Sequence, residues 1–117
     1  AVEKSQRVAE RHRASVKMYY EAGGRIAMGT DAGTPFNYHG ENVLELEYMV
    51  DIGISPLDAL ISSTSTAADL VREKERGRIR SGNFADSLLV DGNPSESISM
   101  VSRKENHRLV VKHGTII

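Results

Sequence analysis

Apolar residues recur at helical spacing at the start of the chain. Positions three and four residues apart, from Val8 to Tyr20, predict a helix that runs through Glu21. Gly23 and Gly24 follow it. Glycine is typical just past a helix end, because it adopts the left-handed backbone conformation without a side-chain clash. The chain therefore opens with an amphipathic helix and a glycine turn.

A short apolar run, Ile26–Met28, follows the glycine turn and precedes an acidic residue, Asp31. The run is too short for a helix and has glycines on both sides, a pattern that predicts a buried strand. A helix, a glycine turn and a strand make half of a βαβ unit. Since a parallel strand needs neighbouring strands, the pattern indicates an α/β sheet whose other strands this sequence hardly provides.

Helical spacing returns in the middle of the chain. It predicts a helix from about Glu41 to Asp51 and another that begins at Ser55-Pro56, with a serine cap and an acidic residue, Asp58, three positions later. The hydroxyl-rich run 62–66 predicts a break, and the threonine that ends it would form a second capping box with Asp69. We expect Asp58 and Asp69 to act as helix caps.

The last third of the chain changes to a β pattern. The charged run 72–76 and the following glycine indicate a solvated helix end and turn. Ser87–Val90 and Leu109–Val111 are short apolar runs bounded by turn residues such as Gly82 and His113-Gly114. Two or three strands are expected, and they need a sheet supplied by something else, because a two-stranded ribbon is marginal in water.

Composition limits the partners. The chain has 117 residues, a formal net charge of −1 and no cysteine. Mixed charges give no electrostatic case for nucleic acid or a membrane surface, and the missing cysteines exclude disulfides, thiolate metal sites and a cysteine nucleophile. The sequence has no transmembrane run, and we expect a cytoplasmic location. The chain begins at Ala1 without an initiator Met, so a signal is not observable and an upstream segment is expected.

Asp31 is the first candidate for chemistry. In parallel α/β sheets and barrels, ligands bind and catalytic side chains lie at the carboxyl ends of the strands, where Asp31 would stand. The alternative is a turn aspartate that caps its own backbone, which is common after a strand. Spacing alone favours the turn aspartate.

Several motifs, in order, resemble one family. Gly29-Thr30-Asp31-Ala32-Gly33-Thr34-Pro35 and the following His39-Gly40 are similar to the last barrel strand of the amidohydrolase superfamily, in its imidazolonepropionase-like and prolidase-like (Xaa-Pro dipeptidase-like) branch. The resemblance continues through Ser55-Pro56-Leu57-Asp58-Ala59-Leu60, Thr64, Ala67-Ala68, Gly77-Arg78-Ile79, Gly82, Ala85-Asp86, Leu89-Val90-Asp91-Gly92-Asn93-Pro94, Val110 and His113-Gly114. It covers essentially the whole chain.

The resemblance implies a fold and a division of the chain. The chain would be the C-terminal part of a longer protein with a (β/α)8 TIM barrel. Residues 1–76 would supply strand 8 and its flanking helices, and residues 77–117 the C-terminal strands of a small β-sandwich domain. The missing N-terminal part of the same protein is thus an expected partner, and we also expect a homo-oligomer.

The resemblance also gives Asp31 a role and reverses the earlier preference for a turn aspartate. Family members bind one or two divalent metal ions, with zinc expected here, mostly through histidines and a lysine on earlier strands that this chain lacks. Asp31 would contact the metal and act as the catalytic proton shuttle between the attacking water and the leaving amine.

The histidines are weaker candidates. His39 follows strand 8 and could bind a substrate carboxylate or carbonyl, with a histidine bonded to nearby backbone as an equal alternative. His12 falls on the apolar face of the first helix and is expected to be a core or interface residue. His107 and His113 lie in the β region, distant from Asp31 in a barrel, and no pair has metal-ligand spacing.

Two classes of function remain open from the sequence. The first is a metal-dependent amidohydrolase that cleaves the amide of a dipeptide or N-acyl amino acid, as a dipeptidase or carboxypeptidase does, or a cyclic amide such as an imidazolone; the isolated chain is expected to be inactive. The second is a non-catalytic fragment or assembly module without a complete metal site.

Overall fold

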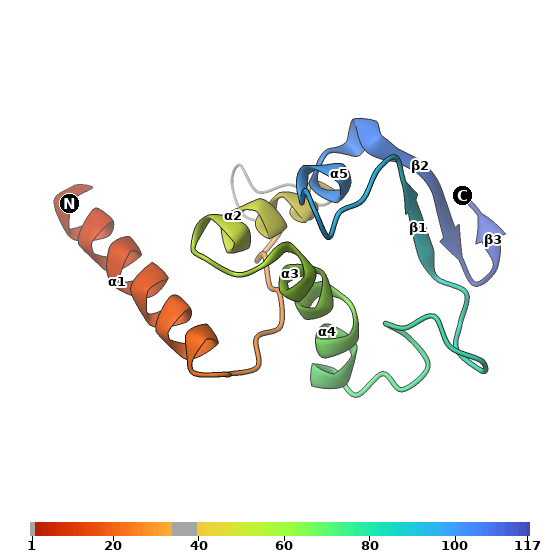
Figure 1. Cartoon of the computed structure of the whole chain (residues 1–117), viewed down its shortest axis with the longest axis horizontal. Coiled ribbons are helices and arrows are strands. Elements are labelled where there is room, and N and C mark those ends of the chain that lie inside the picture. The colour runs from red at the N-terminus through yellow and green to blue at the C-terminus, as the bar shows by residue number, and fades with distance from the viewer. Residues whose placement is uncertain (1, 34–39) are drawn as a thin grey trace.

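The computed structural model describes residues 2–33 and 40–117. The chain forms a layer of helices followed by a small antiparallel sheet (Figure 1). The helical elements are α1 (Val2–Glu21), η1 (Asn42–Leu44), α2 (Glu45–Asp51), α3 (Pro56–Ser63), α4 (Ser65–Leu70), α5 (Ser99–Ser102) and η2 (Lys104–Asn106). The strands are β1 (Ser87–Val90), β2 (His107–Lys112) and β3 (Thr115–Ile116).

Helix α1 stands out from the rest of the chain as a long rod (Figure 1). It ends where the sequence predicted, and Gly23 has a φ of 86°. None of its residues is buried, although Val16 and Tyr20 pack against the core. His12 is exposed, so the expectation that it joins the core is wrong for the described chain. Its alternative role at an interface stays a prediction.

The core lies among α2, α3, α5 and the loop that precedes α3. Its buried residues are Leu46, Met49, Ile54, Ala59, Ile98 and Val101. Burying one large apolar side chain contributes about 1.5–3 kcal/mol, so this cluster holds the helices together. Ile98 and Val101 follow residue 77, so the cluster includes residues from both sides of the predicted boundary. The division into two domains itself stays a prediction.

The segment Ile26–Met28 does not form the predicted strand. It runs as irregular backbone between α1 and the loop before α2, without a ladder partner in the described residues (Figure 1). The physical reason is that strand structure requires hydrogen bonds to a neighbouring strand, and no described segment supplies one here. Ile26 and Met28 nevertheless pack against the core, as expected for a buried apolar run.

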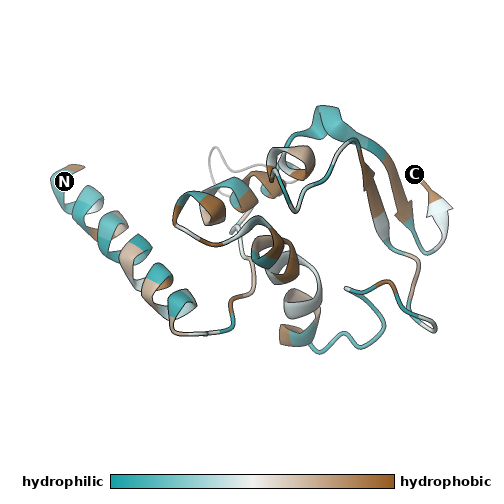
Figure 2. Ribbon diagram, in the orientation of Figure 1, coloured by the Kyte–Doolittle hydropathy of each residue, from teal (hydrophilic) through white to brown (hydrophobic). Residues whose placement is uncertain are grey.

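The predicted β region forms a three-stranded antiparallel sheet in the order β1-β2-β3. Leu88 pairs with Val110 and Leu89 with Leu109, and the register then shifts at Val90. Figure 2 shows apolar residues along β1 and β2. Exposed fractions of 37–56% for these leucines and Val110 show that the described helices do not cover the sheet.

A tyrosine hydroxyl joins α1 to the start of α3. Ser55 caps α3 as predicted, and its Oγ accepts the Asp58 N–H at 3.1 Å. The Asp58 carboxylate does not complete the box, because it accepts the Tyr20 hydroxyl at 2.6 Å, and that hydroxyl accepts the Ser55 N–H at 3.2 Å. Tyr20 therefore bridges the two ends of the capping box and fixes α1 on α3.

Arg76 ties the predicted charged turn to the sheet. Its guanidinium pairs with Glu73 and Asp86 at 3.3 Å, lies 3.0 Å from the His113 Nε2 and stacks over the Phe84 ring. The hydrogen bond from the His113 N–H and the charges of His113 and Arg76 hold the pKa of Asp86 below its usual range. The charged run ends in a turn as predicted, but the Arg76 side chain is half-buried and not fully solvated.

Among the described residues, no helix is both long and apolar enough to cross a membrane.

Two glycines of the β region allow a matched test of packing. Gly77 and Gly82 have φ values of 86° and 87°, so alanine at either position costs about 1–2 kcal/mol in backbone strain. A Cβ on Gly77 would also lie 2.6 Å from the Ala68 Cβ and 2.7 Å from the Thr64 carbonyl oxygen, whereas a Cβ on Gly82 meets nothing within 4 Å.

We therefore expect Gly77→Ala to lower the free energy of unfolding by about 1–3 kcal/mol more than Gly82→Ala does, because it adds a clash to the same strain. Urea unfolding of the two variants measures the difference. Equal losses for the two variants would show that Gly77 is not closely packed on α4.

Candidate active-site segment

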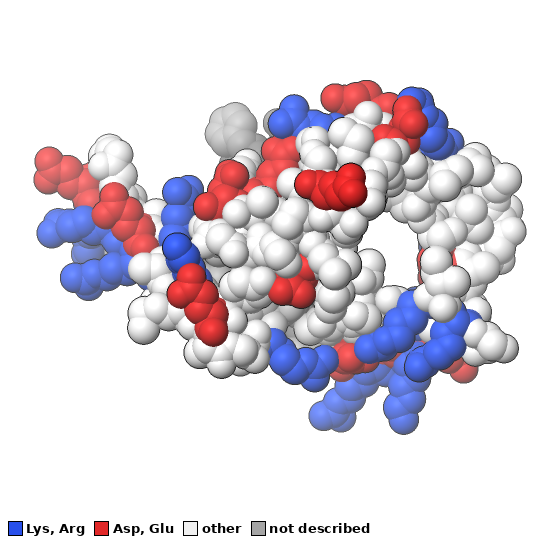
Figure 3. All heavy atoms as spheres, in the orientation of Figure 1, with Lys and Arg blue, Asp and Glu red and all other residues white. Residues whose placement is uncertain are grey.

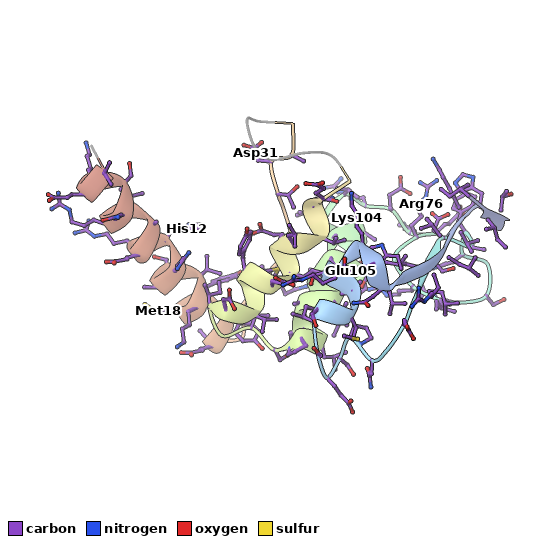
Figure 4. The ribbon with its side chains drawn as sticks, turned by 90° about the horizontal axis from the view of Figure 1, so that it is seen from above. His12, Met18, Asp31, Arg76, Lys104 and Glu105 are labelled. Atoms are coloured by element: carbon purple, nitrogen blue, oxygen red, sulfur yellow. The ribbon has the colours of Figure 1, made fainter. Side chains whose placement is uncertain are left out.

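Asp31 lies at the end of the segment that follows α1, beyond the helical layer (Figure 4). It is exposed and has a φ of 52°. Aspartate is one of the residue types that tolerate this left-handed conformation, so the turn can be made at Asp31 without a glycine. Residues held in uncommon backbone conformations cluster at functional sites, so the backbone of Asp31 supports its candidacy as a functional residue.

A backbone hydrogen bond connects this segment to α3. The Met28 N–H donates to the Ser62 carbonyl at 3.0 Å, three residues before Asp31. Ser62 is buried at the end of α3, and its hydroxyl donates to the Ala59 carbonyl at 2.6 Å. The position of Asp31 thus depends on α3 and on the apolar packing of Ile26 and Met28.

An ion-pair cluster holds the start of the segment. The Asp69 carboxylate receives two hydrogen bonds of 3.0 Å from Arg78 and one of 3.1 Å from Arg25. The predicted role of Asp69 as a helix cap is wrong, because α4 begins at Ser65 and Asp69 lies near its end. The hydrogen bonds and charge of Arg78, and to a smaller extent those of Arg25, hold the pKa of Asp69 below its usual range. Desolvation of the carboxylate acts in the opposite direction.

Two clefts touch the same segment. One of about 470 Å³ is lined by Tyr20, Ile26 and Ser62 among others, and one of about 330 Å³ by His12, Ile26 and Glu45 among others. Burial raises the pKa of Glu45, and the charge of His12 acts in the opposite direction. Figure 3 shows positive and negative side chains mixed over α1 and α2, so this face is neither predominantly basic nor predominantly acidic.

Asp31 fits one part of a metal site. Carboxylate oxygen is a common ligand of zinc and other divalent ions, and an exposed Asp31 can offer it. Within residues 2–33 and 40–117, no group of three or more His, Cys, Asp or Glu side chains is placed to hold a metal ion. The described residues therefore do not form a complete metal site by themselves.

The described histidines do not lie beside Asp31. His39 lies outside the described residues, so its predicted role at the substrate is untested. His12 points from α1, well apart from Asp31 in Figure 4. His107, in β2, donates a hydrogen bond of 2.6 Å from its Nε2 to the Val101 carbonyl in α5. His113 belongs to the Arg76 cluster.

Sequence comparisons identify the family. The model of the amidohydrolase family matches residues 1–117, and the chain belongs to this family. It is 30% identical over 116 residues to an ochratoxinase of Aspergillus niger, covering 97% of this chain and 23% of the relative. It is 31% identical over 90 residues to an imidazolonepropionase of Pyrobaculum arsenaticum, covering 76% of this chain and 22% of the relative. The chain thus spans about a quarter of the length of these relatives.

Solved structures agree with the family assignment. A Xaa-Pro dipeptidase with methionine bound in its active site is 40% identical, with a TM-score of 0.79 over 90% of this chain and 25% of that chain. The Aspergillus niger ochratoxinase is 29% identical, with a TM-score of 0.82 over 95% of this chain and 25% of that chain. The helices and small sheet described above are therefore an arrangement found within amidohydrolase structures.

The Asp69 cluster predicts a pH dependence of stability. The pKa of Asp69 is lower in the folded state than in the unfolded state. The stabilisation from ionised Asp69 is therefore fully present above the pKa of the unfolded state, and it is lost as the pH falls through the pKa of the folded state. We expect Asp69→Asn to lower the urea midpoint at pH 7 and to differ progressively less from the wild type as the pH falls below about 4.

Asp51→Asn is the matched control, because Asp51 is exposed on α2 and pairs with no arginine in the described part of the chain. A constant difference between Asp69→Asn and the wild type at all pH values would contradict the ion-pair explanation.

Proposed function

We propose that this chain is the C-terminal portion of a metal-dependent amidohydrolase that hydrolyses the amide bond of a dipeptide or N-acyl amino acid, with Asp31 as proton shuttle. The observation that carries this proposal is the placement of Asp31: an exposed carboxylate at the end of an apolar segment anchored on the helical layer. Membership of the amidohydrolase family supports hydrolysis of an amide.

The substrate class is proposed from the relatives. A prolidase complexed with N-methylphosphonate-L-proline is 28% identical to this chain, with a TM-score of 0.77. Together with the Xaa-Pro dipeptidase, it favours a dipeptide over other amides. A cyclic amide is the second candidate, favoured by the similarity to imidazolonepropionase.

We further propose that the segment 26–28 is strand 8 of a TIM barrel in the whole protein. Ile26 lines both clefts of about 470 and 330 Å³ beside the segment. Clefts of this size leave room for backbone from another part of the protein, and the apolar residues of the segment fit a buried strand. In that arrangement, Asp31 stands at the carboxyl end of the strand, where barrel enzymes place their catalytic groups.

The chemistry assigned to Asp31 is proton transfer. Its carboxylate accepts a proton from the water that attacks the amide carbonyl, and it then donates that proton to the nitrogen of the leaving amine as the C–N bond breaks. The products are an amine and a carboxylic acid, and the proton balance closes on Asp31. Exposure suits this role, because the carboxylate must reach both water and substrate.

A divalent metal ion, with zinc as the proposed identity, would lower the pKa of a bound water and polarise the substrate carbonyl. The residue of this chain that would hold it is Asp31, through one carboxylate oxygen. The described residues offer no group of three ligands, so we propose that the site is completed outside this chain and that the isolated chain is inactive.

The central test is Asp31→Asn in the whole natural protein that carries this chain. We expect kcat for dipeptide hydrolysis to fall roughly 10²–10⁴-fold, because asparagine keeps the shape of the side chain but cannot accept and return a proton. The metal content of purified protein should be measured in parallel, since Asp31 is also a proposed ligand.

Asp51→Asn, a change of the same chemical type on the exposed face of α2, should leave kcat unchanged. Full activity of Asp31→Asn would reject the mechanism. Metal-dependent turnover by residues 1–117 alone would reject the proposal that the site is incomplete and with it the reading of this chain as one part of an enzyme.

His39 is proposed to bind the substrate rather than to take part in proton transfer. We expect His39→Ala to raise KM on the order of tenfold with kcat little changed, because one hydrogen bond to a charged group is lost. Steady-state kinetics of His39→Ala and of the exposed helix variant His12→Ala measure the effect. A fall in kcat at constant KM would assign His39 to the chemical step instead.

A further inference from the structure

A single residue, Thr64, separates helix α3 from helix α4. Thr64 is both the last cap of α3 and the first cap of α4, with φ −120° and ψ −89°. Its N–H donates to the Ile61 carbonyl at 3.3 Å instead of to the Leu60 carbonyl, which is the partner in a regular α-helix. The interruption therefore leaves the Leu60 carbonyl without its backbone donor.

Two side-chain hydroxyls replace that donor. The Thr64 hydroxyl donates to the Leu60 carbonyl at 2.7 Å, and the Ser63 hydroxyl donates to the same carbonyl at 2.9 Å. Hydroxyls that bond to carbonyls three or four residues earlier offer the backbone an alternative to the helix and bend it. The hydroxyl-rich run thus stabilises the break at the point where it occurs.

The break has a consequence for the Ser62 carbonyl. In a continuous helix this oxygen would accept the N–H of Thr66, four residues later. Here it accepts the Met28 N–H at 3.0 Å, the bond that ties the Asp31 segment to the helical layer. A buried carbonyl whose helical donor has been removed needs another partner, and Met28 supplies it.

We propose that the break between α3 and α4 is a positioning element for Asp31, and that Ser63 and Thr64 are positioning residues that keep the Ser62 carbonyl available to Met28. This inference rests on the proposed function of Asp31 and assigns the support of that residue to side chains that do not touch the substrate. The hydroxyls act through Leu60, Ser62 and Met28 in turn.

The test is the double variant Ser63→Ala/Thr64→Ala in the whole natural protein that carries this chain. Without the hydroxyls, the Leu60 carbonyl regains the Thr64 N–H, the helix continues, and the Ser62 carbonyl turns to Thr66. We expect the Met28 amide to exchange its hydrogen on the order of tenfold faster, and kcat to fall about tenfold to a hundredfold, with KM changed much less.

The melting temperature distinguishes positioning from a general loss of structure. Alanine favours the helix, so the double variant should melt no lower than the wild type even though the Met28 amide is less protected. Thr66→Ala, in the same run but inside α4, is the matched control and should change neither exchange nor kcat. Thr64→Ser keeps a hydroxyl at this position and should leave both Met28 exchange and kcat at the wild-type level.

Each outcome decides one proposal. Unchanged Met28 protection in the double variant, or lost protection with unchanged kcat, overturns the positioning role. If the double variant does not fold, the single changes Ser63→Ala and Thr64→Ala, which each leave one hydroxyl on the Leu60 carbonyl, should give smaller increases in Met28 exchange, and their absence overturns it equally. An active Asp31→Asn protein, with Met28 exchange still sensitive to the hydroxyls, rejects the proposed function alone.

Discussion

The burial of Leu46 and its apolar neighbours is the interaction on which the other features depend. Leu46 is 2% exposed and Ala59 is fully buried, and they join α2 to α3. The segment that carries Asp31 is not a strand here, so it cannot take its position from a ladder. Ile26 and Met28 take it from this core, and the hydrogen bond to Ser62 then fixes the direction in which the segment leaves.

Local features of the fold were predictable from the sequence because their determinants lie within one turn of the chain. The cap at Ser55, the glycine turn after α1 and the presence of strands near Ser87–Val90 and Leu109–Val111 follow from such short-range patterns. The pairing of these two strands with each other was not predicted. The helix break was predicted from its run of hydroxyls. The capping roles of Asp58 and Asp69 were wrong. The Asp58 carboxylate accepts the Tyr20 hydroxyl from outside the local pattern. Asp69 lies near the end of α4, because the helix begins at Ser65, and it pairs with Arg78.

The predicted strand at 26–28 shows a second reason why a prediction from the sequence can fail. Its apolar residues Ile26 and Met28 are partly buried against the core, but strand structure also needs a neighbouring strand, and that requirement lies outside the segment. The same reasoning applies to the candidate site. The motif around Asp31 predicted the candidate residue. The hydrogen bond from Met28 to the Ser62 carbonyl could not be predicted from the sequence, because every residue type has a backbone carbonyl.

The position of α5 in the core has a consequence for the order of events during synthesis. Ile98 and Val101 complete a cluster that begins at Leu46, about half of the described chain earlier. A ribosome that has released the helices α1 to α4 has not yet released the side chains that close them, and contacts between such distant residues form late. The Asp31 segment would therefore gain its fixed place only after residue 101 has emerged, which couples the ordering of this segment to the synthesis of α5.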